Sequence, residues 1–394
     1  MSSSGSDLAS PQVARPRDLR EARDVFVAAA RAGQRVLIRG TGTAQSWGAP
    51  VHDVDLVVDT TGLDRVLAYN PADMTVAVGA GIPLTDLHAT LREQRVALDA
   101  ARVAEGATVG GLLATADGGP LRLTYGTLRD LVIGVTVVLA DGTVARSGGH
   151  VIKNVAGYDL AKLFAGSLGA FGLVAEVVLR LHPRPKATGT LVVPCDVPTA
   201  FTHATTLLAS PWEPAAVDWC DGTLLARFEG TPTGVETRLH KAATSLGVDH
   251  DIVDGPREAA TWAQVAEVVR GVEGDTVLRA GTRPDALPQL AAALDSLAAE
   301  HGVEASLTSS LGVGVHTVRL RGGSLDGHAH VVRAWRRRVL ESGGSVTLHR
   351  RPHALDELVP SWGPAPTSAT LLRALKQQLD PDGRLAPGRF APWL

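Results

Sequence analysis

The chain has 394 residues, 45 % of them hydrophobic and 20 % charged, and its formal net charge is −3. Its length suffices for two or three domains with hydrophobic cores of their own. The near-neutral charge gives no electrostatic reason to expect a nucleic acid or an anionic membrane surface as partner. The longest apolar run, residues 131–140, is shorter than the ~20 residues of a membrane-spanning helix.

Two further features favour a cytoplasmic protein. The N-terminal residues 1–14 lack the basic and apolar regions of a secretory signal, and we expect a disordered lead-in there. Cys195 and Cys220 belong to no partner motif, so free thiols in a reducing compartment are expected. An iron–sulfur cluster takes more ligands than these two cysteines supply.

Residues 15–185 combine short strands with occasional helices. Helices are expected at 19–32, where Gly33 stops the helix, and from Pro83 onward. Strands are expected at residues 35–39, 54–58, 75–78, 131–140, 143–146 and 173–181. Asp141-Gly142 predicts a hairpin turn between two of these strands. The order predicts an α+β domain rather than a regular βαβ alternation.

Residues 186–350 form a second expected domain, an α+β cap. Its expected strands lie at residues 190–193, 215–219, 223–228, 276–280, 306–311, 316–319 and 345–349. Its expected helices lie at residues 200–209, 234–246, 287–301 and 328–342. The order approximates βαββαβ, repeated, as in ferredoxin-like sheets. In the last segment, 351–394, a helix at 369–379 is followed by a turn at 380–383 and a closing loop.

A glycine-rich loop, Gly40-Thr41-Gly42-Thr43-Ala44-Gln45, follows the strand expected at 35–39. A Rossmann fingerprint would need a third glycine at position 45 and a helix beyond it, and the chain has neither. The loop can still bind a phosphate, because successive backbone N–H groups can form an anion nest. Arg39, Thr41, Thr43 and Ser46 would add charge and hydroxyl donors. The alternative is an ordinary tight turn.

Two more glycine-rich stretches follow. The first contains Thr108-Val109-Gly110-Gly111, Thr115, Gly118-Gly119 and Tyr125-Gly126. It can lie flat along a long polar ligand, and its apolar members imply burial rather than a surface loop. The second, residues 149–172, places five glycines among apolar residues. Glycine in a packed segment indicates close approach of the backbone to a ligand or another strand, although a helix-to-strand connection in a large core would also explain it.

Four of these motifs occur in an order that resembles the FAD-binding domain of the vanillyl-alcohol-oxidase or p-cresol-methylhydroxylase (PCMH) type. They are RGTGT at 39–43, TVGG at 108–111, YG at 125–126 and NVAGYDLAKLFAGSLGAFG at 154–172. The resemblance covers residues 15–185 and implies a two-lobed FAD-binding domain. It implies that the first loop cradles the pyrophosphate, that TVGG and YG flank the dinucleotide, and that the strand after residue 172 contacts the adenosine. The FAD-binding residues expected are Arg39, Gly40, Thr41, Gly42, Thr43, Ala44, Gln45, Thr108, Val109, Gly110, Gly111, Thr115, Tyr125, Gly126 and Val174.

The segments KNVAGYDLAKLFAGSLG and LKQQLDPDGRLAPGRF look like the FAD-binding, E-type subunits of bacterial glycolate oxidases. This resemblance implies a 2-hydroxy-acid substrate such as glycolate, a sister flavin subunit and an iron–sulfur subunit as partners. It implies a C-terminal tail that returns to the FAD-binding domain, and a cytoplasmic location or one peripheral to the inner membrane through the complex. Lys153, Asn154 and Tyr158 are expected to approach the isoalloxazine or the substrate as catalytic residues.

The chain also departs from its look-alikes. Relatives that link FAD covalently often carry histidine where this chain has Thr43, so we expect FAD to be bound without a covalent bond. The Glu-His-Gly stretch of catalytic 2-hydroxy-acid dehydrogenases does not occur, and Pro352 prevents His349 and His353 from sharing a helix face, so no metal site is expected.

No base is evident beside the candidate cations Lys153, Arg279 and Arg319, and we therefore expect the isolated chain to be a poor enzyme. Two alternatives stay open. One is a stand-alone FAD-dependent oxidoreductase for another alcohol or hydroxy acid, and the other is a scaffold subunit that has lost its flavin.

Overall fold

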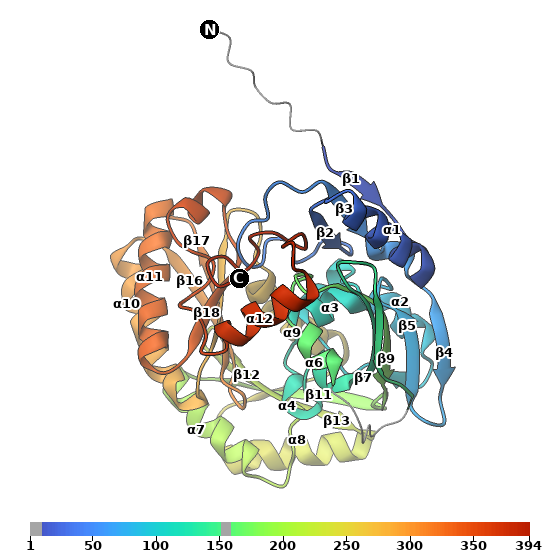
Figure 1. Ribbon diagram of the computed structural model, residues 1–394. Helices are drawn as coiled ribbons and strands as arrows, with labels where there is room; N and C mark the ends of the chain where they lie inside the picture. The colour runs from blue at the N-terminus through green and yellow to red at the C-terminus, as the bar shows by residue number, and fades with distance from the viewer. Residues whose placement is uncertain (1–9, 151–158) are drawn as a thin grey trace.

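The computed structural model describes residues 10–150 and 159–394. Figure 1 shows the blue-to-green N-terminal part beside the yellow-to-red C-terminal part, with helix α12 lying across the N-terminal part. Lys153, Asn154 and Tyr158 lie outside the described residues. No helix of the described residues is long and apolar enough to cross a membrane.

The first lobe of the N-terminal part is a parallel sheet in the order β1-β3-β2. Its strands are β1 Gln12–Ala14, β2 Val36–Arg39 and β3 Leu56–Asp59, and helix α1, Leu19–Arg31, connects β1 to β2. Asp18 caps α1 by accepting a hydrogen bond from the N–H of Glu21 at 2.8 Å. Phe26 on this helix is buried in a core shared with β2 and β3. The C-terminal end of β2 leads directly into the glycine-rich loop.

The second lobe is a sheet of five antiparallel strands in the order β4-β5-β9-β7-β8. The strands are β4 Val66–Asn70, β5 Thr75–Gly79, β7 Val132–Val138, β8 Val144–Gly148 and β9 Leu173–Arg180. The predicted hairpin joins β7 to β8, with Gly142 at φ 88° and the Asp141 carboxylate accepting from the N–H of Thr143 at 2.7 Å. Short elements surround this sheet: α2 Leu84–Thr90, β6 Gln94–Arg95, α3 Val109–Thr115, α4 Arg122–Tyr125, α5 Leu128–Leu131, α6 Leu160–Phe164 and β10 His182–Pro183.

The C-terminal part is built on a sheet of eight strands in the order β14-β11-β13-β12-β16-β17-β15-β18. Two βαββαβ units form it, and they join where β12 pairs with β16. The first unit comprises β11 Ala187–Pro194, α7 Val197–Leu208, β12 Ala216–Cys220, β13 Thr223–Gly230, α8 Pro232–Leu246 and β14 Asp251–Val253. The second comprises β15 Thr276–Gly281, α10 Leu287–Glu300, β16 Glu304–Ser310, β17 Val315–Arg321, α11 Leu325–Glu341 and β18 Ser345–Arg350. The ferredoxin-like pattern and its repetition, predicted from the sequence, are confirmed.

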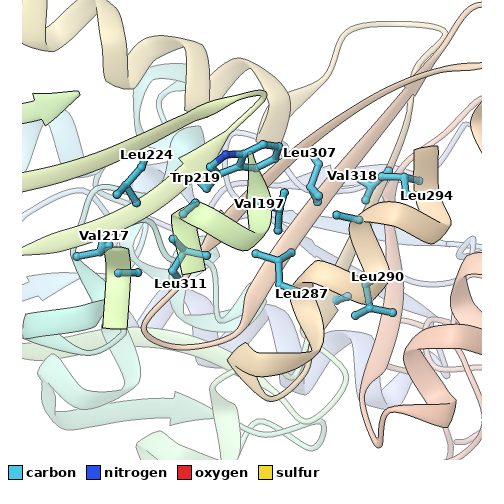
Figure 2. Close-up of a cluster of buried hydrophobic side chains, with 14 of the residues drawn as sticks. Val197, Val217, Trp219, Leu224, Leu287, Leu290, Leu294, Leu307, Leu311 and Val318 are labelled. Atoms are coloured by element: carbon cyan, nitrogen blue, oxygen red, sulfur yellow. The ribbon is translucent and has the colours of Figure 1, made fainter. Parts of the chain in front are cut away.

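The two faces of this sheet differ in composition. Apolar residues of α7 and α10 pack with every second residue of the strands, as Figure 2 shows for Leu287, Leu307 and Val318. The opposite face carries Asp218, Thr308, Ser310 and Thr317, which are buried although polar. Helix α9, Gly255–Arg270, lies between the two units in sequence and packs on this second face through Trp262 and Val265. A polar surface is therefore enclosed between the sheet, α9 and the N-terminal part.

The C-terminal tail returns to the first lobe, as the sequence predicts. Helix α12, Ala369–Leu379, is followed by a turn, and Leu385 then forms a parallel bridge with Val36 of β2. The N–H of Val36 donates to Arg384 O at 2.8 Å, and the N–H of Ala386 donates to Val36 O at 2.9 Å. Leu385 is fully buried in the core of the first lobe. The tail is thus an added edge of the parallel sheet.

Several elements have no counterpart in the sequence expectations: β1, β4, α3, α6 and α9. The most consequential is α3, because residues 108–115 were expected to lie open along a ligand. Thr108 caps this helix instead, its Oγ1 accepting from the N–H of Gly111 at 3.1 Å. The apolar residues Val109, Leu112 and Leu113 bury one side of the helix in the core, and this burial outweighs the poor helix propensity of two glycines.

Candidate cofactor site

The glycine-rich loop after β2 forms the first wall of a large pocket. Gly42 has φ 84°, a left-handed conformation that glycine adopts without strain. Among the described residues, the N–H groups of Thr41, Gly42 and Thr43 have no hydrogen-bond acceptor. The Thr41 hydroxyl donates to Gly106 O at 2.9 Å, which fixes the loop against the segment before α3. Successive backbone donors at a positive φ are the structural requirement for an anion nest.

Two buried arginines hold the loop in place. Arg102 donates from Nε to Thr43 O at 3.1 Å. Arg389, from the C-terminal tail, donates from Nη1 to Gln45 O at 2.8 Å and to Trp47 O at 2.7 Å. Both side chains also line the pocket. The tail therefore shapes the cofactor site from a point more than 300 residues away in sequence.

Helix α3 forms the second wall, and its packing explains two of the glycines. A Cβ at Gly40 would collide with the side chain of Thr108, so the loop can lie against α3 only with glycine there. A Cβ at Gly110 would lie 2.9 Å from Ala80 O, so this glycine serves helix packing. The N–H groups of Val109 and Gly110 donate to Ile82 O and Ala80 O at 2.9 and 2.6 Å. These two N–H groups of α3 are therefore not available to bind an anion, whereas those of the 40–45 loop are.

The third wall is the segment from Leu168 to Val174. The N–H of Leu168 donates to Ala114 O at 2.8 Å, which ties this segment to α3. Gly172 has φ 146°, and a Cβ there would lie 2.9 Å from Val138 O. Both constraints require glycine at this position. The start of β9 therefore lies beside the pocket, and its residues Leu173 and Val174 line the pocket.

The pocket enclosed by these walls has a volume of about 800 Å³ including its open mouth. The residues expected to bind FAD that line it are Gly40, Thr41, Gly42, Thr43, Ala44, Gln45, Thr108, Gly110, Gly111, Thr115 and Val174. The glycine-rich loop, α3, the 168–174 segment and the C-terminal tail thus meet at one pocket.

Four other expected residues lie elsewhere. Arg39 is paired with Asp59 at 3.9 Å outside the lining. Val109 is fully buried in the core of the second lobe. The Tyr125 hydroxyl donates to Glu229 Oε2 of β13 at 3.0 Å and so joins the two parts of the chain. Gly126 packs against Asp130 within the N-terminal part.

The sequence analysis missed several lining residues, above all Arg102, Asp117 and Arg389. Arg102 is 2 % exposed and lies over the Trp47 ring at 4.8 Å, and its Nη1 has no hydrogen-bond partner within residues 10–150 and 159–394. Burial lowers the pKa of this guanidinium from its ordinary value. A sequence signal existed, because Arg102 stands between the apolar pairs Ala100-Ala101 and Val103-Ala104.

Asp117 is an acidic residue of the pocket lining. It is 1 % exposed, and its Oδ1 accepts from Arg279 Nη1 and from the N–H of Gly118, both at 2.9 Å. Arg279 comes from β15, so this ion pair joins the pocket to the polar face of the large sheet. The Oδ2 atom has no hydrogen-bond partner among the described residues.

Comparison with known proteins agrees with this geometry. Residues 10–148 match the FAD binding domain family, and this match identifies FAD as the cofactor of this part of the chain. The fold is similar to that of alkyldihydroxyacetonephosphate synthase, with a TM-score of 0.72 at 16 % identity over 95 % of this chain and 75 % of the other.

Among curated relatives, glycolate oxidase subunit GlcE of Escherichia coli is 30 % identical over 197 residues, which are 50 % of this chain and 56 % of that protein. D-lactate dehydrogenase of Archaeoglobus fulgidus is 34 % identical over 183 residues, 46 % of this chain and 41 % of the relative. An uncharacterized FAD-linked oxidoreductase of Mycobacterium tuberculosis is 31 % identical over 219 residues, 55 % of this chain and 48 % of the relative. The chain spans about half the length of the curated relatives it matches.

The residues present fit FAD. The 40–45 loop offers unused backbone donors for a pyrophosphate, and the buried Arg102 adds positive charge to the same wall. Thr43 occupies the position at which a covalent link would need histidine.

We therefore expect acid precipitation of the purified protein to release all of its flavin into the supernatant. Thr43 offers only a hydroxyl at the linkage position, and no nucleophilic ring nitrogen is available there. The measurement is the flavin absorbance of pellet and supernatant. Flavin that stays with the washed pellet would contradict non-covalent binding.

Proposed function

We propose that this chain is an FAD-dependent oxidoreductase that acts on a 2-hydroxy acid such as glycolate, as the FAD-binding subunit of a larger complex. The observation that carries the proposal is the pocket in which the 40–45 loop, α3, the 168–174 segment and the tail meet. The printed names of relatives, among them glycolate oxidase subunits, D-lactate dehydrogenases and a D-2-hydroxyglutarate dehydrogenase, support the substrate class.

The chain's residues have distinct tasks in this proposal. The backbone N–H groups of Thr41, Gly42 and Thr43 bind the pyrophosphate, and α3 and Val174 position the rest of the dinucleotide. When bound, FAD supplies the two-electron redox chemistry, while the protein supplies binding and orientation. Lys153, Asn154 and Tyr158 remain proposed to approach the isoalloxazine or the substrate.

The proposed partners are a sister flavin subunit and an iron–sulfur subunit. A route for single electrons beyond the flavin needs a further centre, and the two free cysteines of this chain are too few to hold a cluster. Cys220 is moreover a poor ligand, because burial raises the pKa of its thiol to about 12. The cluster is therefore assigned to another subunit.

Turnover of the isolated chain with glycolate or D-lactate and an artificial acceptor is expected to be slow, and to rise when the partner subunits are added. The reason is that no Glu-His-Gly stretch is available for the chemistry and that electrons leave through the partners. The measurement is steady-state turnover of the chain alone and of the complex. Fast turnover by the chain alone would contradict the subunit assignment and favour a stand-alone oxidoreductase.

A further inference from the structure

A second cavity adjoins the cofactor pocket. It begins at Gly118, the residue after Asp117, and lies between this segment, α9 and the polar face of the large sheet. The space not filled by atoms there is about 350 Å³, part of which is open to solvent. Its polar lining comprises Arg122, Arg279, Asp218, Thr308, Ser310 and Thr317.

The register of four neighbouring strands brings this polar lining together. Asp218 of β12 pairs with Ser310 of β16, Thr308 of β16 pairs with Thr317 of β17, and Thr317 pairs with Arg279 of β15. Residues that are direct partners across a sheet project from the same face. These polar side chains therefore lie on the same face of the sheet. Val265 and Val269 of α9 line the opposite side of the cavity with apolar surface.

Arg122 is the unpaired cation of this cavity. Among the described residues its guanidinium has no ion-pair or hydrogen-bond partner, whereas Arg279 is paired with Asp117. A Cβ built on Gly118 would lie 3.8 Å from the Arg122 Cζ, so the guanidinium lies beside the segment that leads out of the cofactor pocket. Burial, and secondarily the charge of Arg279, lowers the pKa of Arg122 to about 10, so it stays charged at neutral pH. A free, partly buried guanidinium is suited to bind a carboxylate through two parallel hydrogen bonds.

Asp218 is the second side chain of the cavity with an atom that is available to bind a ligand. It is 4 % exposed, and its Oδ1 accepts from the Ser310 hydroxyl at 2.8 Å. Its Oδ2 has no hydrogen-bond partner among the described residues. Burial raises the pKa of this carboxyl to about 7; the charge of Asp99 adds to the effect, and Arg122 and Arg227 oppose it. A carboxyl with these properties can form a hydrogen bond with a ligand hydroxyl in either protonation state.

We propose that this cavity binds a small 2-hydroxy acid, with Arg122 pairing with its carboxylate and Asp218 Oδ2 bonded to its hydroxyl group. The inference rests on the proposed function, because the cavity meets the FAD pocket at the Asp117–Arg279 ion pair. It names residues of this chain that recognise the substrate class. Neither Arg122 nor Asp218 belongs to the residues expected from the sequence to act in catalysis.

The test uses the purified flavin-containing chain and isothermal titration with 2-hydroxyisobutyrate. This probe carries a carboxylate and an adjacent hydroxyl but no hydrogen on the hydroxyl-bearing carbon, so it binds without being oxidised. Isobutyrate lacks the hydroxyl, and tert-butanol lacks the carboxylate. We expect the affinity to fall in the order 2-hydroxyisobutyrate, isobutyrate, tert-butanol.

Arg122→Ala is expected to weaken binding of both acids by ~10–100-fold, the range for hydrogen bonds to a charged group. Arg122→Lys should recover part of the affinity because it restores the charge without the planar fork. Asp218→Asn should reduce the preference for 2-hydroxyisobutyrate over isobutyrate and leave isobutyrate binding nearly unchanged. Arg129→Ala, at an exposed arginine of the neighbouring helix α5, is the matched control and should bind all three probes normally.

Flavin content and melting temperature are measured on the same samples. Unchanged affinity in a folded, flavin-containing Arg122→Ala chain would overturn the assignment, as would binding of tert-butanol as tight as that of the acid. Either result would contradict the assignment of this cavity as the 2-hydroxy-acid site. Neither result would contradict the FAD site. A purified chain that contains no flavin and does not bind added FAD would contradict the proposed function.

Discussion

Removal of residues 380–394 is expected to lower the melting temperature and the flavin content together. The tail supplies Leu385, fully buried in the core of the first lobe, and pairs with Val36 at the edge of the parallel sheet. It also supplies Arg389, whose Nη1 holds the carbonyls of Gln45 and Trp47 in the cofactor loop. One deletion therefore removes a core residue, a sheet edge and a support of the cofactor site.

Point variants separate these contributions and remain informative if the truncated chain does not fold. Leu385→Ala is expected to reduce the free energy of unfolding by ~2–5 kcal/mol, as for other buried leucines. Arg389→Ala should mainly reduce FAD affinity, because its side chain supports the loop. Arg373→Ala removes an exposed hydrogen bond from α12 to Trp393 O and is the control. A truncated chain with unchanged melting temperature and flavin content would show that the tail is dispensable.

Gly42→Val is expected to give a folded chain that loses FAD. Gly42 has φ 84°, which a β-branched residue adopts only with strain, and its N–H is one of the donors proposed to face the pyrophosphate. Loss of two charge-assisted hydrogen bonds would weaken FAD binding by roughly 3–6 kcal/mol, about 140- to 20,000-fold. The measurement is FAD affinity of the flavin-free variant, followed by flavin fluorescence.

Gly33→Val is the matched control for this variant. Gly33 follows α1 with φ 62°, and a Cβ there would meet no atom within 4 Å. The substitution carries comparable backbone strain but lies outside the pocket. Gly33→Val should therefore lose some stability and retain FAD. If Gly42→Val retains FAD as well as Gly33→Val does, the loop is not the pyrophosphate site.

Local patterns predicted much of the fold. The alternation and turn residues of the C-terminal part predicted both βαββαβ units except strand β14, because each strand buries one face against helices. The Asp141-Gly142 dipeptide predicted the hairpin between β7 and β8, because Asp-Gly between two strands favours a tight turn. The return of the tail was predicted from the resemblance and from the apolar residues Leu385 and Phe390, but nothing in residues 380–390 indicates that the partner is Val36. Helix α3 was missed because two glycines lower helix propensity, and the burial that compensates is visible only in three dimensions.

In the site, too, residues that are close together in the sequence could be predicted, and residues that only the fold brings together could not. The 40–45 loop is recognisable because its glycines and hydroxyl residues are consecutive. Arg389 lies more than 300 residues from the loop that it holds, and Arg122 and Asp218 become neighbours only through packing of α4 on β12. A sequence signal existed for the polar face, since Thr308 and Ser310 alternate with Leu307 and Leu311 in one strand region. Polar residues in a strand usually face solvent, so the pattern alone could not show that another part of the chain covers them.

The FAD pocket itself is tested most directly by titrating the flavin-free chain with FAD and, separately, with FMN, and measuring stoichiometry and affinity for each. We predict that each chain binds one FAD. We also predict much weaker binding of FMN, which lacks the pyrophosphate linkage and the adenosine that the 40–45 loop and Val174 are proposed to contact. Absence of FAD binding by a folded chain, or equal affinity for FMN and FAD, would contradict the account.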